Sequence, residues 1–320
     1  MTAAAPRKII IDTDPGIDDA MAIYFALKAP ELDVIGLTTI FGNVHTSLAT
    51  TNALRLLEIA GRTDIPVAKG ADHPIASEYE GPVPFVHGGD GQGNLYLDPP
   101  TTSALAVPAA QWIVEQVMAH PGEITLVPVG PLTNIALALH LEPRIVQHVR
   151  EVVLMGGNAI VPGNATPAAE ANIHNDPEAA DIVFGAAWNV TMIGLDVTHR
   201  VNMTREHIEL YGSVGSPLTD HVMKMLPVYQ GYFERAYGID GIYVHDSSAV
   251  AYVIDPTLFR IEHWPIRVET MGRSRGKTWP ALGEVLLPDW KDRPKVGVAV
   301  DVDSERLIRL EHARMLEGSN

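Results

Sequence analysis

The chain has 320 residues, of which 46% are hydrophobic and 19% charged, and this balance is typical of a packed globular protein. Its 39 acidic and 23 basic side chains give a net charge of −16 with histidine neutral, which argues against nucleic acid and anionic membranes as partners. Because the chain contains no cysteine, disulfides and thiolate chemistry are excluded, and any metal must be bound by oxygen or imidazole ligands.

No apolar run is long enough to span a membrane, and the short polar start shows no targeting pattern, so we expect a cytoplasmic protein. The densest basic group consists of Arg273, Arg275 and Lys277. We interpret this group as a solvated loop, because three cations in an acidic chain do not make a nucleic-acid groove.

Short apolar segments alternate with amphipathic ones through the first half of the chain. Residues 8–11 predict a strand and residues 18–29 a helix, and three further pairs of strand and helix follow. These pairs are 34–40 with 46–60, 124–129 with 132–141, and 152–155 with 177–185. Such alternation predicts an α/β fold with an open, mostly parallel central sheet and helices on both faces.

The rest of the sequence contains no linker, low-complexity tract or repeat, so residues 1–320 are expected to form a single domain. Residues 71–102 and 156–175 are rich in turn-forming residues and predict long loops, which are often functional. The later predicted elements are a helix at 216–237, a loop at 238–244, a helix from Asp246, and strands near 259–268 and 295–302 that close the sheet.

Four aspartates, Asp12, Asp14, Asp18 and Asp19, lie where the first predicted strand leads into the first helix. A single aspartate at a helix start is commonly a cap for free N–H groups. Four carboxylates together repel one another, and a cation or shared protons must relieve that repulsion. With only oxygen ligands in view, the natural cation is Ca²⁺ or Mg²⁺.

A second acidic position, His245-Asp246, follows a glycine-containing loop and opens a later helix. Asp246 alone is readily explained as a helix cap. Together with the first aspartates, it offers a further ligand for a hard cation, while the imidazole of His245 can donate a proton to a leaving group.

Asparagine and glutamate side chains gather in the predicted loop 156–175, at Asn164, Glu170 and Asn172, and Asn43 follows the second predicted strand. Asparagine in loops commonly only forms turns. Amide and carboxylate groups also make directional hydrogen bonds to several hydroxyls at once, as sugar recognition requires.

The segment Asp-Thr-Asp-Pro-Gly-Ile-Asp-Asp-Ala at residues 12–20 resembles the amino-terminal signature of the inosine/uridine-preferring nucleoside hydrolases. The resemblance runs along nearly the whole chain. It continues through Thr-Thr-Ile-Phe-Gly-Asn at 38–43, Val-His-Gly at 86–88, Pro-Val-Gly-Pro-Leu-Thr-Asn at 128–134, Met-Gly-Gly at 155–157, Ala-Glu-Ala-Asn at 169–172 and His-Asp at 245–246.

The resemblance implies that one Ca²⁺ is held by Asp14, Asp19, Asp246 and the main-chain carbonyl of Val129. Further residues implied to bind substrate are Asp18, Asn43, Asn164, Glu170 and Asn172 at the ribose, His87 on the base side and His245 near the leaving base. It also implies a small-molecule nucleoside as substrate and assembly into a homodimer or homotetramer.

The implied reaction is hydrolysis of the N-glycosidic bond of purine or pyrimidine ribonucleosides, giving ribose and free base. The metal lowers the pKa of a water, Asp14 accepts its proton, and the resulting hydroxide attacks the anomeric carbon with inversion. His245 or water protonates the leaving base.

The chain departs from many relatives at Ala171, where they carry phenylalanine between the glutamate and the asparagine, so the base preference stays open. Aromatic residues at helical spacing more often belong to the core than to a base-stacking site. We therefore expect the following residues to be core residues: Tyr229, Tyr232, Phe233, Tyr237 and Tyr243.

Two other functions fit parts of the sequence. A Mg²⁺-dependent phosphohydrolase would use Asp12 and Asp14 after the first strand, but no basic cluster accompanies them to bind phosphate. A non-catalytic, calcium-dependent nucleoside-binding protein would retain the same ligands and release no sugar.

Overall fold

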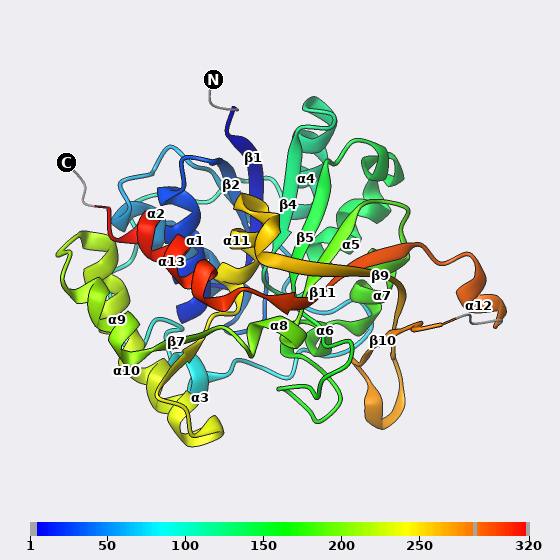
Figure 1. Cartoon of the computed structure of the whole chain (residues 1–320). Coiled ribbons are helices and arrows are strands. Elements are labelled where there is room, and N and C mark those ends of the chain that lie inside the picture. Colours follow the sequence, from blue (N-terminus) through cyan, green and yellow to red (C-terminus); the bar gives the residue numbers. More distant parts are fainter. Residues whose placement is uncertain (1–4, 284–286, 318–320) are drawn as a thin grey trace.

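The computed structural model describes residues 5–283 and 287–317. In this part of the chain, nine strands form one sheet in the order β10-β9-β11-β6-β5-β4-β1-β2-β3 (Figure 1). The strands from β11 to β3 are parallel, whereas β9 runs antiparallel to β11 and β10. Their bounds are β1 (Arg7–Thr13), β2 (Leu32–Thr39), β3 (Val67–Lys69), β4 (Ile124–Pro128), β5 (Glu151–Met155), β6 (Val190–Ile193), β9 (Phe259–Val268), β10 (Thr278–Pro280) and β11 (Lys295–Val302).

Helices cover both faces of this sheet because successive side chains of the central strands enter two separate cores. In β1, Ile9 and Ile11 belong to one core and Ile10 to the other, and Val153 and Val152 of β5 divide in the same way. The first core is completed by α1 (Ile17–Lys28), α2 (Thr46–Ile59), α9 (Arg205–Gly212), α10 (Pro217–Tyr237), α11 (Asp246–Ile254) and α13 (Ser304–Met315), and the second by α4 (Ala109–Ala119), α5 (Thr133–Leu141) and α7 (Pro177–Gly185). The predicted fold class is thereby confirmed.

Short elements complete the structure. The remaining helices are α3 (Pro84–His87), α6 (Ala171–Asn175), α8 (Leu195–Thr198) and α12 (Pro288–Lys291), with single 3-10 turns η1 (Pro143–Gln147), η2 (Pro256–Leu258) and η3 (Gly272–Ser274). The segment 238–244, predicted as a loop, contains β8 (Gly241–Tyr243), which pairs antiparallel with β7 (Asn202–Thr204). That prediction was wrong because a three-residue strand has too few residues for a recognisable alternation. The outermost residues of the predicted 1–320 domain lie outside the described residues.

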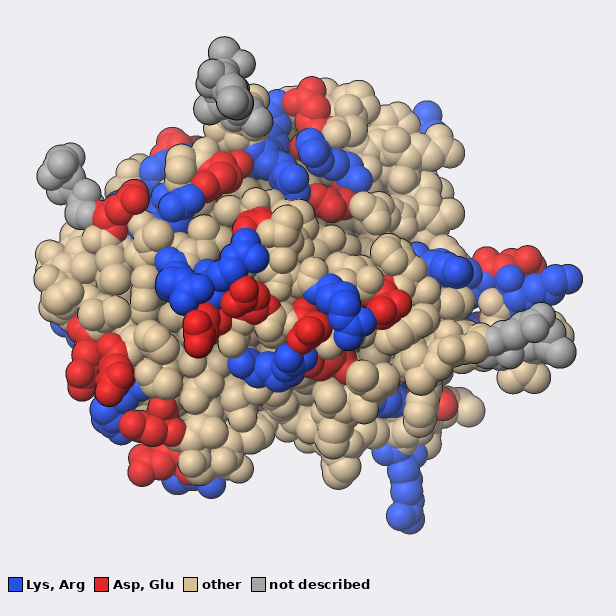
Figure 2. Space-filling view, viewed as in Figure 1, with Lys and Arg blue, Asp and Glu red and all other residues tan. Residues whose placement is uncertain are grey.

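Acidic and basic side chains are interspersed on the face drawn in Figure 2. Arg200 lies 2.5 Å from Asp301, and Arg306 lies 3.0 Å from Asp255. None of the helices in the described residues has the length and hydropathy needed to cross a membrane.

Candidate active site

The aspartate loop, residues 12–19, joins β1 to α1 at the carboxyl end of the parallel strands, where open α/β sheets bind ligands. A cavity of about 390 Å³ opens there. Nine of the eleven predicted site residues line this cavity: Asp18, Asn43, His87, Val129, Asn164, Glu170, Asn172, His245 and Asp246. The other two, Asp14 and Asp19, are buried and accept hydrogen bonds from Asn43 in the cavity wall.

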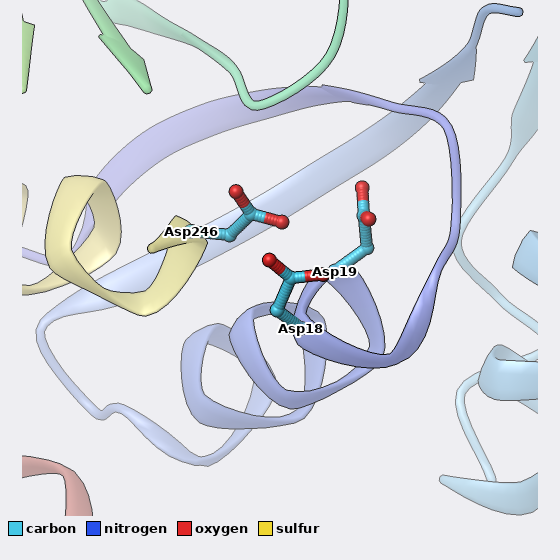
Figure 3. Close-up of side chains that lie close together, drawn as sticks. All are labelled: Asp18, Asp19 and Asp246. Carbon is cyan, nitrogen blue, oxygen red and sulfur yellow. The ribbon is translucent and has the colours of Figure 1, made fainter. Parts of the chain in front are cut away.

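Three aspartates from two helices converge at the cavity. Asp18 and Asp19 lie in the first turn of α1 and Asp246 begins α11, and one oxygen from each lies within 4.8 Å of the other two. Figure 3 shows Asp18 and Asp246 turned toward each other from these helices. The two helices pack against each other, which brings together residues more than 200 positions apart in sequence.

Within residues 5–283 and 287–317, neither lysine nor arginine forms an ion pair with these carboxylates. Burial raises the pKa of Asp246 well above its ordinary value, and the charges of Asp18 and Asp19 raise it further. Burial and repulsion from Asp19 likewise raise the pKa of Asp14. Neither lysine nor arginine occurs among the described residues that line the cavity. A cation bound among the aspartates would keep them ionised together.

The surroundings of Asp14 fit a cation or a water molecule. Asp14 Oδ2 accepts the N–H of Asn43 at 2.6 Å, whereas Asp14 Oδ1 and Asp18 Oδ1 are buried without a hydrogen-bond partner among the described residues. Two glycines keep this carboxylate clear: a Cβ at Gly42 would lie 2.0 Å from Asp14 Oδ2, and one at Gly130 would lie 2.7 Å from Oδ1. Donors that are all oxygen suit Ca²⁺ or Mg²⁺.

Asp18 is oriented by an aromatic residue from α10. The Tyr229 hydroxyl donates to Asp18 Oδ2 at 2.8 Å, and the Tyr229 ring stacks on His87 at 5.3 Å between ring centroids. His87 Nδ1 accepts the N–H of Ile17 at 3.1 Å, and burial lowers the pKa of His87 to about 4. His87 is therefore a neutral, fixed wall of the cavity at physiological pH.

The segment 156–175, predicted as a loop, ends in helix α6 and supplies a further part of the cavity wall. Glu170 accepts the N–H groups of Gly157 and Asn172, at 2.8 and 2.9 Å, and caps α6. Asn164 Oδ1 accepts the N–H of Ala171 at 3.0 Å. The Asn172 amide donates to the carbonyls of Val129 and Met155 at 2.9 and 3.1 Å, which ties this loop to the ends of β4 and β5.

Lys277 is hydrogen-bonded to the same segment. This corrects the interpretation of the basic group at residues 273–277 as a solvated loop. Its ammonium is buried and donates to the carbonyls of Asn158 and Ala159 at 2.6 and 3.2 Å. Arg275 is paired with Glu178 at 2.6 Å. Only Arg273 is exposed as predicted.

His245 lies at the cavity with its Nδ1 2.8 Å from the hydroxyl of Thr198 in α8. Burial lowers the pKa of His245 well below its ordinary value, and the neighbouring imidazoles His199 and His87 lower it further. When the Thr198 hydroxyl donates to Nδ1, the neutral ring carries its N–H on Nε2 and can donate a hydrogen bond from there.

The family model described as "Inosine-uridine preferring nucleoside hydrolase" matches residues 9–309. The chain belongs to this nucleoside hydrolase family. It is 47% identical to "Probable uridine nucleosidase 2" of Arabidopsis thaliana over 97% of this chain and 98% of the relative.

Two further nucleoside hydrolases are similar over nearly their full length. The "Inosine-uridine preferring nucleoside hydrolase" of Leishmania major is 44% identical and is covered to 94%, with 93% of this chain matched. A solved plant nucleoside hydrolase superimposes with a TM-score of 0.95 at 43% identity, covering 98% of this chain and 99% of that one. The predictions of family and enzyme class, a hydrolase of the N-glycosidic bond, are confirmed.

The aromatic residues of this nucleoside hydrolase serve both the core and the cavity. Tyr229 and Phe233 are only 2% exposed and belong to the core, as predicted, yet they also line the cavity together with Tyr232 and Tyr237. Tyr243 is not among the lining residues and packs against His199 and Phe233. Ala171 lines the cavity too.

The sequence grouped Asp12 with the aspartates of the predicted cation site, which the structure corrects, and it gave no sign of several supporting residues. Asp12 accepts hydrogen bonds from Thr38 and Asn134, and burial raises the pKa of Asp12 to about 7. It therefore joins β1 to its neighbours rather than facing the cavity. Thr198, which orients His245, gave no sequence signal because it lies in a four-residue helix.

Proposed function

We propose that this nucleoside hydrolase depends on calcium and releases ribose from purine or pyrimidine ribonucleosides by attack of water on the anomeric carbon. The observation that carries the proposal is the convergence of Asp14, Asp18, Asp19 and Asp246 beside the cavity, with neither lysine nor arginine among its described lining residues. Buried carboxylates that repel one another favour the binding of a cation. The match to the nucleoside hydrolase family supports the reaction.

Asp14, Asp19, Asp246 and the carbonyl of Val129 are the proposed calcium ligands. The Val129 carbonyl accepts one hydrogen bond, from Asn172, and retains a second lone pair. When bound, Ca²⁺ would lower the pKa of a water molecule and hold ribose hydroxyls in its coordination shell.

Asp14 is assigned as the base that takes a proton from the attacking water. Its Oδ2 is held by the N–H of Asn43, which leaves the unpartnered Oδ1 as the proton acceptor. The carboxylates of Asp18 and Glu170 would stabilise positive charge that develops on the sugar ring as the base departs.

The remaining cavity residues divide between the sugar and the base. Asp18, Asn43, Asn164, Glu170 and Asn172 are proposed to bind the ribose hydroxyls, because carboxylate and amide groups form the directional bonds that hydroxyls need.

On the base side, His87, Tyr229 and Phe233 offer ring faces. His245 or water would protonate the leaving base, and His245 must first take up a proton for this, because burial keeps its ring neutral. Assembly into a homodimer or homotetramer and a cytoplasmic location stay predictions.

The first test is release of reducing sugar from uridine, cytidine, inosine, adenosine and guanosine, measured with calcium, after chelation, and after calcium or magnesium is restored. We expect release with calcium, loss on chelation and recovery with calcium. Tight nucleoside binding without release would favour the non-catalytic binder. Recovery with magnesium alone, or phosphate release from a phosphate ester, would favour the phosphohydrolase.

A further inference from the structure

The glycine-rich segment 88–96, which follows His87, has no part in the proposed reaction, yet it contacts the aspartate loop. Gln92 is 1% exposed, and its Nε2 donates to the carbonyls of Pro15 and Gly16 at 3.3 and 3.0 Å. Asn52 of α2 is fully buried and donates to the Pro15 carbonyl at 3.1 Å. Two side-chain amides therefore hold the backbone between Asp14 and Asp18.

The two carbonyls belong to peptides whose N–H groups support the site. The N–H of Gly16 shares a peptide with the Pro15 carbonyl and donates to Asp19 Oδ2 at 2.9 Å. The N–H of Ile17 shares a peptide with the Gly16 carbonyl and donates to His87 Nδ1 at 3.1 Å. A trans peptide is planar, with its carbonyl and N–H directed oppositely, so a fixed carbonyl also fixes the direction of the N–H.

We propose that Gln92 and Asn52 are positioning residues that hold the aspartate loop in the shape that its cation site requires. The proposal rests on the calcium-dependent function proposed above. Fixing the Gly16 N–H orients Asp19 directly. Fixing the Ile17 N–H orients the His87 ring, on which Tyr229 stacks, and Tyr229 in turn donates to Asp18.

The segment 88–96 is itself held firmly, as a positioning element must be. The buried carboxylate of Asp90 accepts the N–H groups of Gln92 and Asn94, both at 2.8 Å, and that of Tyr96 at 2.6 Å. Asn52 also donates to the Asp90 carbonyl at 2.9 Å. Tyr96 has a φ value of 45°, a left-handed conformation that is rare for a bulky residue and persists only when its surroundings enforce it.

The same hydrogen bonds would be present if Gln92 and Asn52 only stabilised the fold. The test therefore needs measurements that a change in stability alone does not alter. Gln92→Met keeps the length of the side chain and removes both N–H donors. In the full chain, we expect the dissociation constant for Ca²⁺, measured by calorimetry, to rise about tenfold to a hundredfold, the range found when groups that support metal ligands are removed. Hydrogen exchange at the amides of Gly16 and Ile17 should accelerate in the same variant.

Tyr24→Phe is the matched control because it removes one buried hydrogen bond from α1, between Tyr24 and His221 at 2.8 Å, without touching the loop carbonyls. It should lower thermal stability and leave calcium affinity unchanged. Calcium affinity and exchange rates in Gln92→Met within twofold of the wild type would overturn the proposal. A wild-type chain that binds no calcium would instead overturn the proposed function, and the exchange rates would still decide whether Gln92 holds the loop.

Discussion

The two ends of the parallel sheet differ in whether their charged side chains are paired with opposite charges. At the amino end, Arg7 lies 3.1 Å from Glu151, and Lys8 lies 2.7 Å from Glu123, so each charge has an opposite and partly exposed partner. At the carboxyl end, buried aspartates lie close together at the cavity, and neither lysine nor arginine accompanies them among its described lining residues. Paired surface charges contribute little to stability, whereas unpaired buried charges lower it and persist where function requires them.

Removing the general base, Asp14, at the carboxyl end of the sheet should have the largest effect on turnover. Asp14→Asn keeps the size of the side chain but removes its ability to accept a proton, so turnover with calcium should fall by about 10³-fold. The measurement is the rate of ribose release, with circular dichroism to check folding. Asp33→Asn, on an exposed position of β2, is the matched control and should keep the wild-type rate. Wild-type turnover in Asp14→Asn would remove Asp14 from the mechanism.

A buried carboxylate outside the cavity tests how far burial alone lowers the free energy of unfolding. Burial raises the pKa of Glu311 in α13 from 4.5 to about 7, although the Tyr211 hydroxyl donates to it at 3.0 Å. The folded state therefore binds more protons than the unfolded state between pH 4.5 and 7, and stability falls as pH rises through that window.

Glu311→Gln removes this titration, and we expect it to raise the free energy of unfolding by about 3 kcal/mol at pH 8 relative to its effect at pH 4.5. Denaturant unfolding at the two pH values measures the difference. Equal effects of the substitution at both pH values would show that Glu311 does not change its protonation on unfolding.

The role of His245 should depend on the leaving base. His245→Gln keeps a polar side chain but removes the imidazole proton donor, so we expect hydrolysis of inosine to slow by about 10²-fold, with a smaller change for uridine. The ratio of kcat/KM for the two nucleosides measures this. An equal loss for both would instead point to a role of His245 in positioning Asp246.

The smallest effect is expected at the amino end of the sheet. Arg7→Gln breaks the ion pair with Glu151, whose side chain is 14% exposed, and should lower the free energy of unfolding by about 0.2 to 1 kcal/mol. Ribose release should not change. A large loss of activity would contradict the distinction between the two ends of the sheet.

Regular periodicity explains why most of the sheet was predictable. The apolar residues of β1 enter cores on both faces, and β9 and β11 occupy the ranges predicted for them, because long runs with β-branched residues identify strands locally. Short elements such as β8 and α8 have too few residues for a recognisable period. Lys277 was misinterpreted because its burial depends on the loop 156–175 packing over β10, a contact between distant segments.

The family, the α/β fold and the aspartates that converge on the cavity could be inferred from the amino-acid sequence, because these depend on short motifs and local periodicity. Only the folded chain shows which side chains support the aspartates. Tyr229 reaches Asp18 from 211 residues away, and Gln92 reaches the Gly16 carbonyl from 76 residues away. Such hydrogen bonds arise only when helices and loops pack, since no local pattern records which buried donor will meet which acceptor.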